Sequence, residues 1–225
     1  MNNMEQQLST WDEYYKSRVR NNDYRGAFRA KYSRFIEEII VNIKRISHQM
    51  ETPVILKEEG CGIGTVSLAI SETEKSLVSS LGLAEDSDLK EVSKVIFSDI
   101  STPMLDLCCK NTRLIYTGDY LAMVPFFYSR ENICETKFFE TATLVVTHGV
   151  LEHFSDDDIT KIISTYNDDN VLFQAHYVPT DHYETPSFGD ERLLPVEIWI
   201  NLVKPDYYIL DNNECDLYMF KIKKA

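Results

Sequence analysis

Hydrophobic positions recur at two different spacings along this chain, and the spacing changes near residue 50. In FRAKYSRFIEEIIVNIKRIS, within residues 27–47, apolar side chains repeat at i, i+3, i+4 and i+7, which is the spacing of one face of an α-helix. Residues 10–20 also favour a helix. The pattern therefore predicts a helical N-terminal extension, which we place at residues 1–50.

From residue 53 onward, short apolar runs rich in β-branched residues replace the helical spacing. They are PVILK (53–57), KVIFSD (94–99), RLIYTGD (113–119), ATLVVTHG (142–149) and NVLFQAHYV (170–178). Their apolar residues are continuous rather than alternating, which indicates strands covered on both faces, as in a parallel sheet. Segments that can form helices separate most of them, and this alternation is typical of an α/β fold.

The end of the chain has a different pattern. DYYILDN and ECDLYMFKIK flank a short polar turn at Asn212 and Asn213, which predicts an antiparallel hairpin. Together with the preceding runs, the hairpin predicts one doubly wound α/β domain over residues 51–225, with a mostly parallel sheet that ends in antiparallel strands.

Composition excludes several classes of protein. The chain has 225 residues, 44% of them hydrophobic and 26% charged, which is ordinary for a globular protein with a sizeable core. No run of about 18 apolar residues exists, and the N-terminus MNNMEQQLSTWDEYY lacks the features of a secretory signal. The five cysteines show no C-x₂₋₄-C pair, so we expect reduced thiols, no zinc site and a cytoplasmic protein.

The charge distribution is uneven. A formal net charge of −13 argues against binding along a nucleic-acid backbone, which requires a basic face. Residues 16–34 nevertheless contain seven basic side chains and a single acid, Asp23. A solvated helix face is the simpler interpretation of this segment, and a local site for a ligand carboxylate or an acidic partner is the other.

Three glycines stand within five positions of EEGCGIGT (58–65), directly after the first predicted strand. In a doubly wound sheet, ligands bind beyond the carboxyl ends of the strands, where glycines let a ligand approach the backbone. The dinucleotide fingerprint G-x-G-x-x-G/A, started at Gly60, requires Gly or Ala where this chain has Thr65. The carboxylate of Glu58 would repel a pyrophosphate and suits a cationic ligand, which argues against a nicotinamide-dependent oxidoreductase.

EEGCGIGT resembles motif I of the class I S-adenosylmethionine-dependent methyltransferases, and three later segments are similar to further motifs of that family. VIFSDISTPMLDLCCKN resembles its second strand and following helix, YTGDY its third strand end, and LVVTHGVLEHFSDDDI the fourth strand and the turn after it in the small-molecule branch. The resemblance spans residues 53 to about 165, and the terminal hairpin fits the family's sixth and seventh strands. It implies a seven-stranded sheet, with S-adenosylmethionine (SAM) as the cofactor.

The resemblance also implies a set of cofactor-binding residues. Glu58 would pair with the ammonium group of SAM, Asp99 with its ribose hydroxyls and Asp119 with its adenine amino group. In this family an N-terminal helix often closes over the cofactor, so Tyr15 or Arg18 would reach its carboxylate. The other residues implied at this site are Gly60, Cys61, Gly62, Gly64, Ile100, Met104, Tyr120, His148 and Gly149.

Some of these residues have simpler explanations. Asp119 follows Gly118 in a common turn sequence, and Cys61 is a small filler with no basic neighbour to activate it. Gly64 and Asp99 are 35 residues apart, whereas the dinucleotide pattern places its acid about 20 residues on. The excess, within residues 66–94, predicts an extra helix or surface loop before the second strand.

His153 is the candidate catalytic residue, as a base or to orient a substrate carboxylate, because an ordinary histidine pKa of about 6.5 suits proton transfer. It is also explained as a packed core histidine, and Glu152 as a helix-capping residue. The sequence thus predicts a methyltransferase that acts on a small molecule. A protein or peptide methyltransferase and a catalytically inactive binding subunit of the same fold are the alternatives.

Overall fold

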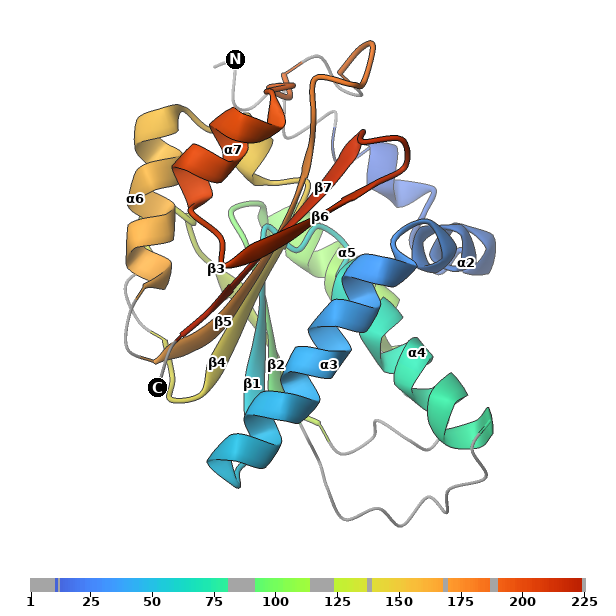
Figure 1. Cartoon of the computed structure of the whole chain (residues 1–225). Helices are drawn as coiled ribbons and strands as arrows, with labels where there is room; N and C mark the ends of the chain where they lie inside the picture. The colour runs from blue at the N-terminus through green and yellow to red at the C-terminus, as the bar shows by residue number, and fades with distance from the viewer. Residues whose placement is uncertain are drawn as a thin grey trace.

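The computed structural model describes residues 11, 13–80, 92–113, 124–136, 139–167, 170–186 and 190–223. Its elements alternate between strands and helices along most of this length (Figure 1). The helices are α2 (Asn22–Lys31), α3 (Ser33–Met50), α4 (Thr65–Ser80), α5 (Thr102–Arg113), the 3₁₀ turn η2 (Leu151–His153), α6 (Asp156–Tyr166) and α7 (Val196–Val203). The strands are β1 (Val54–Glu59), β2 (Val92–Asp99), β3 (Phe126–Arg130), β4 (Thr143–His148), β5 (Val171–Pro179), β6 (Tyr207–Asp211) and β7 (Asp216–Ile222).

All seven strands form one sheet in the order β3-β2-β1-β4-β5-β7-β6. β1 pairs in parallel with both β2 and β4, and β7 runs antiparallel to both β5 and β6. This confirms the predicted doubly wound sheet with a terminal antiparallel hairpin. Because the strand order reverses between β1 and β4, the crevice at their carboxyl ends is the expected place for a ligand.

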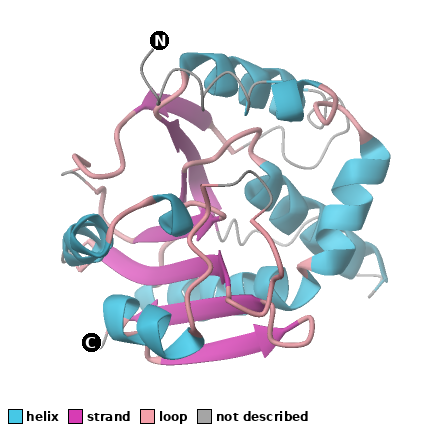
Figure 2. Ribbon diagram, turned by 90° about the horizontal axis from the view of Figure 1, so that it is seen from above, coloured by secondary structure: helices cyan, strands magenta, loops and turns pink. Residues whose placement is uncertain are grey.

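Two helical layers cover the sheet, with α3 and α4 on one face and α6 and α7 on the other (Figures 1 and 2). The first face holds a core that includes Phe35, Phe97 and Phe220, and the second a core that includes Tyr166 and Trp199. All six residues of β1 are buried, which explains why its sequence is continuously apolar until its charged end.

The helix predicted at residues 27–47 is divided at Tyr32 into α2 and α3. The backbone of Tyr32 leaves the helical region (φ −104°, ψ 25°), and its ring packs edge-on against His148, 4.4 Å between ring centroids. α3 then buries the isoleucines whose spacing predicted it. Earlier in the chain, residues 13–16 are helical and the predicted helix 10–20 ends in a turn at residues 17–20.

The third strand differs from the sequence prediction. Arg113 is the last residue of α5, and the rest of the predicted strand 113–119 lies outside the described residues, as do Asp119 and Tyr120. β3 is instead Phe126–Arg130, a partly exposed strand at the sheet edge. Its sequence FFYSR is short and only partly apolar, because an edge strand is not covered on all sides.

α4 occupies the first part of the segment predicted to contain an additional helix or loop, and residues 81–91 are outside the described chain. Within the described residues, no helix combines the length and apolarity needed to cross a bilayer.

Candidate functional site

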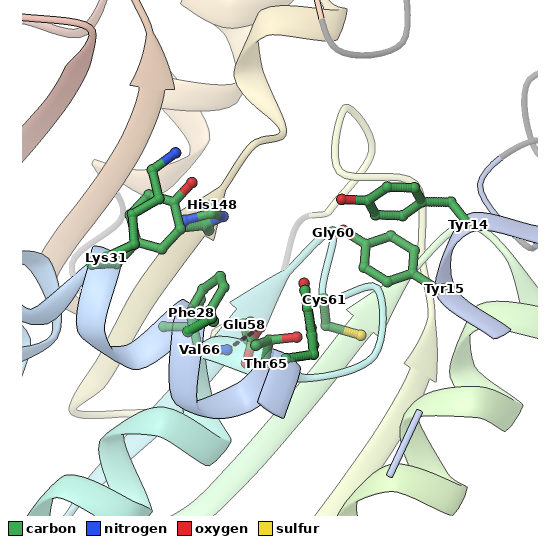
Figure 3. A pocket seen from close by; sticks show the side chains of 13 residues that line it. Tyr14, Tyr15, Phe28, Lys31, Glu58, Gly60, Cys61, Thr65, Val66 and His148 are labelled. Carbon is green, nitrogen blue, oxygen red and sulfur yellow. Dashed lines mark hydrogen bonds between the residues drawn. The ribbon is translucent and has the colours of Figure 1, made fainter. Parts of the chain in front are cut away.

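The carboxyl ends of β1 and β4 border a cavity of about 330 Å³. Figure 3 shows Tyr14 and Tyr15 on one side of it and Lys31 and His148 on the other. We call it the first cavity. It is lined by Tyr14, Tyr15, Tyr24, Ala27, Phe28, Lys31, Tyr32, Glu58, Gly60, Cys61, Thr65, Val66 and His148.

Glu58 is fixed at the start of α4. Its Oε2 accepts hydrogen bonds from the Ser67 backbone N–H at 2.9 Å and the Ser67 hydroxyl at 2.5 Å, and its Oε1 accepts one from the Val66 N–H at 3.3 Å. A carboxylate is favourable there because the N-terminus of a helix carries partial positive charge. Burial nevertheless raises the pKa of Glu58 to about 7, against the opposing effect of these hydrogen bonds. Glu58 therefore changes charge near neutral pH while it lines the cavity.

The glycines of the first strand-to-helix turn do not all leave room for a ligand. All three have positive φ, but a Cβ on Gly60 would lie 2.6 Å from a Val150 methyl group. A Cβ on Gly64 would lie 2.8 Å from the Cys108 sulfur and from the Phe97 ring. The space beside these two glycines is thus filled by the protein's own packing, a correction to their expected role. Gly60 lines the first cavity, whereas Gly62 and Gly64 line neither cavity of this site.

Asp99, the last residue of β2, is oriented by two backbone N–H groups. Its Oδ2 accepts from Gly62 at 3.0 Å and its Oδ1 from Ser101 at 2.9 Å. Each oxygen keeps a further lone pair for another donor. Ile100 is 38% exposed and Met104 is buried, and none of Asp99, Ile100 and Met104 lines the first cavity.

Aromatic residues of the N-terminal segment lie over this turn. Trp11 stacks on Tyr15 with 5.9 Å between ring centroids, and Tyr14 contacts Tyr15 edge-on at 4.9 Å. A Cβ on Gly62 would lie 3.6 Å from the Tyr15 ring, so Tyr15 covers the glycine whose N–H binds Asp99. We call Trp11, Tyr14 and Tyr15 the aromatic cover.

Arg18, in contrast, lines neither cavity. It donates a hydrogen bond to the Tyr14 backbone carbonyl, and its guanidinium carbon lies 3.3 Å from the centroid of the Tyr14 ring. It therefore supports the aromatic cover, whereas Tyr15 is the one of the two predicted residues that lines the cavity.

A second cavity of about 170 Å³ adjoins the first and shares five lining residues with it. The shared residues are Tyr14, Tyr15, Lys31, Tyr32 and His148. Those that line only the second cavity are Trp11, Gly149, Glu152, Tyr177, Pro179, Tyr183, Thr185, Glu191 and Leu193.

His148 is the last residue of β4 and lies where the two cavities meet. Its ring stacks on Tyr177 at 4.3 Å and contacts the edge of Tyr32 at 4.4 Å. Burial lowers its pKa to about 3, so the imidazole is neutral at physiological pH. Its Nε2 is buried and has no hydrogen-bond partner among the described residues.

The two residues of η2 are placed differently from the sequence interpretation. His153 lines neither cavity: its Nδ1 lies 3.1 Å from Asp190 Oδ2 and its ring meets Trp11 edge-on. Glu152, interpreted as a capping residue, instead lines the second cavity and is 3% exposed. Burial raises the pKa of Glu152 to about 8, with smaller contributions from Glu191 and Asp190.

Sequence reasoning also missed Lys31. Its Nζ donates to the Tyr183 hydroxyl at 3.1 Å and lies 3.9 Å from Asp216 Oδ2. The hydroxyls of Tyr177 and Tyr183 both donate to Asp216 Oδ1, at 3.0 and 2.6 Å. Residues 32, 177, 183 and 216 are far apart in sequence, so no local pattern could have grouped them.

The rest of the basic segment 16–34 faces acids of the protein itself. Arg25 and Arg29 both pair with Glu72, at 3.1 and 3.5 Å, and Arg34 lies 3.7 Å from Asp211. Its charge is therefore largely matched within the molecule.

No family model matches the chain, and no curated protein matches it. Among solved structures, magnesium protoporphyrin IX methyltransferase (ChlM) from Synechocystis PCC 6803 with bound SAM has a TM-score of 0.59 at 10% identity, covering 97% of both chains. Monomeric WbdD has a TM-score of 0.55 at 13% identity, and the small RNA methyltransferase HEN1 one of 0.59 at 11%. The match covers 82% of this chain and 40% of WbdD, and 84% of this chain and 25% of HEN1.

These structures share the strand arrangement but act on different acceptors by their names. The chain has the Rossmann-like fold of the class I SAM-dependent methyltransferases.

Proposed function

We propose that this chain is a SAM-dependent methyltransferase that acts on a small-molecule acceptor. The observation that carries the proposal is the pair of adjoining cavities beyond β1 and β4, one against the motif I residues and one beside it. In ChlM, which has the same fold, SAM is bound in the crystal. When bound, SAM supplies a methyl group on a positively charged sulfur.

The residues present fit this cofactor. Glu58 lines the first cavity and offers a carboxylate edge to an ammonium group, and Asp99 has free lone pairs for two hydroxyls. Cys61 and Gly60 line the same cavity. Asp119 and Tyr120 stay the expected adenine contacts.

Tyr15 covers Gly62 next to Asp99, so binding of a nucleoside at Asp99 requires the Tyr15 ring to move. In its new position the aromatic cover would close over the ligand. Closure of this kind removes water and holds two reactants in line, which supplies much of the catalysis when the leaving group is already activated.

The cavities favour a small acceptor over a protein. The second cavity is about 170 Å³ and lies under the aromatic cover, a space for a small molecule rather than a folded partner. The basic segment that would dock an acidic protein is paired with Glu72 and Asp211.

Calorimetric titration with SAM and with S-adenosylhomocysteine (SAH) tests the proposal. We expect both to bind, and Asp99→Ala to weaken binding by more than about tenfold because a charged acceptor of two hydrogen bonds is lost. Asp106→Ala, at an exposed position of α5, is the matched control and should bind as the wild type does. Absence of binding to both ligands at high micromolar concentration would end the proposal.

The inactive-subunit alternative needs a different measurement. Incubation with a metabolite extract and isotope-labelled SAM should produce a labelled small molecule heavier by one methyl group. Binding of SAH without any labelled product would favour the inactive subunit, and label in protein instead would favour a protein methyltransferase.

A further inference from the structure

Glu152 contributes a buried carboxyl group with an unused oxygen to the second cavity. The residue is 3% exposed, and its Oε2 has no hydrogen-bond partner among the described residues. A buried polar atom without a partner costs stability, so such an atom beside a cavity indicates that a donor is missing there. The missing donor must be an N–H or O–H group, because an ionised carboxylate only accepts hydrogen bonds.

The charges around the second cavity favour a positively charged donor. Among the described residues, Lys31 is the cation that lines this cavity, and Asp216 lies 3.9 Å from its Nζ. Glu152 and Glu191 also line it, and the charge of Asp190 acts on Glu152 as well. Once Lys31 and Asp216 are counted together, the remaining charge is negative.

Aromatic side chains provide the rest of the surface. Rings hold cations by their negative faces, an attraction that strengthens when water is excluded. His148 is neutral and adds no repulsion. The rings that line the second cavity besides His148 are Trp11, Tyr14, Tyr15, Tyr32, Tyr177 and Tyr183.

We propose that the second cavity binds a small organic ammonium ion, with Glu152 as its counter-ion and the rings around it. This inference rests on the proposed function, since the bound amine would be the methyl acceptor. It names amines as the acceptor class, over neutral alcohols and over anions held by Lys31.

The same carboxyl can prepare the amine. An ammonium nitrogen has no free lone pair, so it must lose one proton before it can act as a nucleophile. Transfer of that proton to Glu152 leaves a neutral amine and a neutral carboxylic acid. With a pKa of about 8, raised by burial and by Glu191 and Asp190, Glu152 is a suitable proton acceptor for an amine.

Three probes of one shape and different charge test the proposal: phenethylamine, 2-phenylethanol and phenylacetate. Each is titrated calorimetrically into the wild-type protein, with and without saturating SAH. We expect phenethylamine to bind at least about tenfold more tightly than the other two, as an ion pair in a water-poor site provides. Equal binding of all three, or tighter binding of phenylacetate, would overturn the proposal and in the second case assign the contact to Lys31.

Glu152→Gln keeps the shape of the side chain and removes its charge. It should weaken phenethylamine by about tenfold and leave 2-phenylethanol unchanged, a difference that a general structural defect would not produce. Glu184→Gln, at an exposed position of the same loop, is the control for lost charge and should bind all probes as the wild type does. An unchanged phenethylamine affinity in Glu152→Gln contradicts the assignment.

The proposed function fails separately. If SAH does not bind, the chain is not a SAM-dependent enzyme, while the titrations without SAH still decide which charge the cavity prefers. If SAH binds and the amine is not preferred, the methyltransferase proposal stands and the acceptor is not an amine.

Discussion

Substitution of Glu152 by glutamine should change how stability depends on pH. The glutamine has nearly the same shape but cannot titrate, so it isolates the contribution of one buried carboxyl group. Burial raises the pKa of Glu152 from its ordinary value of 4.5 to about 8. Glu191 and Asp190 contribute in the same direction, and the neutral His148 lines the same cavity.

The sign follows from proton binding. Between pH 4.5 and about 8 the folded protein keeps the Glu152 proton that the unfolded chain has released. The folded state therefore binds more protons, and the free energy of unfolding falls as the pH rises through this window. For a group of this kind, about 3 kcal/mol is lost between about pH 5 and about pH 8.

Urea unfolding followed by far-ultraviolet circular dichroism at several pH values measures this loss. Glu58 also has a raised pKa, to about 7, so the wild-type slope contains its contribution too. The informative quantity is the difference: Glu152→Gln should lose about 3 kcal/mol less than the wild type over the window. The amide of the variant adds a cost that does not change with pH.

Equal losses in the two proteins would show that Glu152 titrates alike folded and unfolded, and would refute its burial as a neutral acid. Glu184→Gln should retain the wild-type dependence, because its side chain is exposed.

Three further predictions test the motif I turn and the aromatic cover. Gly64→Ala should lower the free energy of unfolding by about 2 kcal/mol or more, because its φ is +73° and the new methyl group would meet Cys108; thermal unfolding measures this. Gly26→Ala on α2, where the methyl group meets nothing within 4 Å, should instead stabilise by about 0.5–1 kcal/mol, and a lower melting temperature would contradict that. SAH should change the fluorescence of Trp11, which stacks on Tyr15, and the change should vanish in Trp11→Phe, where only the buried Trp199 remains; a signal that persists would place the movement elsewhere.

The sequence by itself determined the layers of the fold. Strands covered on both faces must be apolar along their length, so β1, β4 and β5 were visible as continuous apolar runs, and α3 as a stripe of isoleucines. β3 escaped because an edge strand needs no continuous apolar run.

Local motifs also located the edge of the sheet where the site lies. Glu58 and His148 stand at the ends of strands that parallel pairing brings to one edge. The end of a strand is a local property of the chain, and so a motif can mark it.

Only the tertiary structure decided what surrounds that edge. Val150, Cys108 and Phe97 fill the space beside Gly60 and Gly64, a fact that depends on packing between distant segments. The same holds for the second cavity, where Lys31 and Glu152 meet although 121 positions separate them in the chain. Burial sets the charge of a carboxyl group, and burial is a property of the folded molecule that a residue's neighbours in sequence do not reveal.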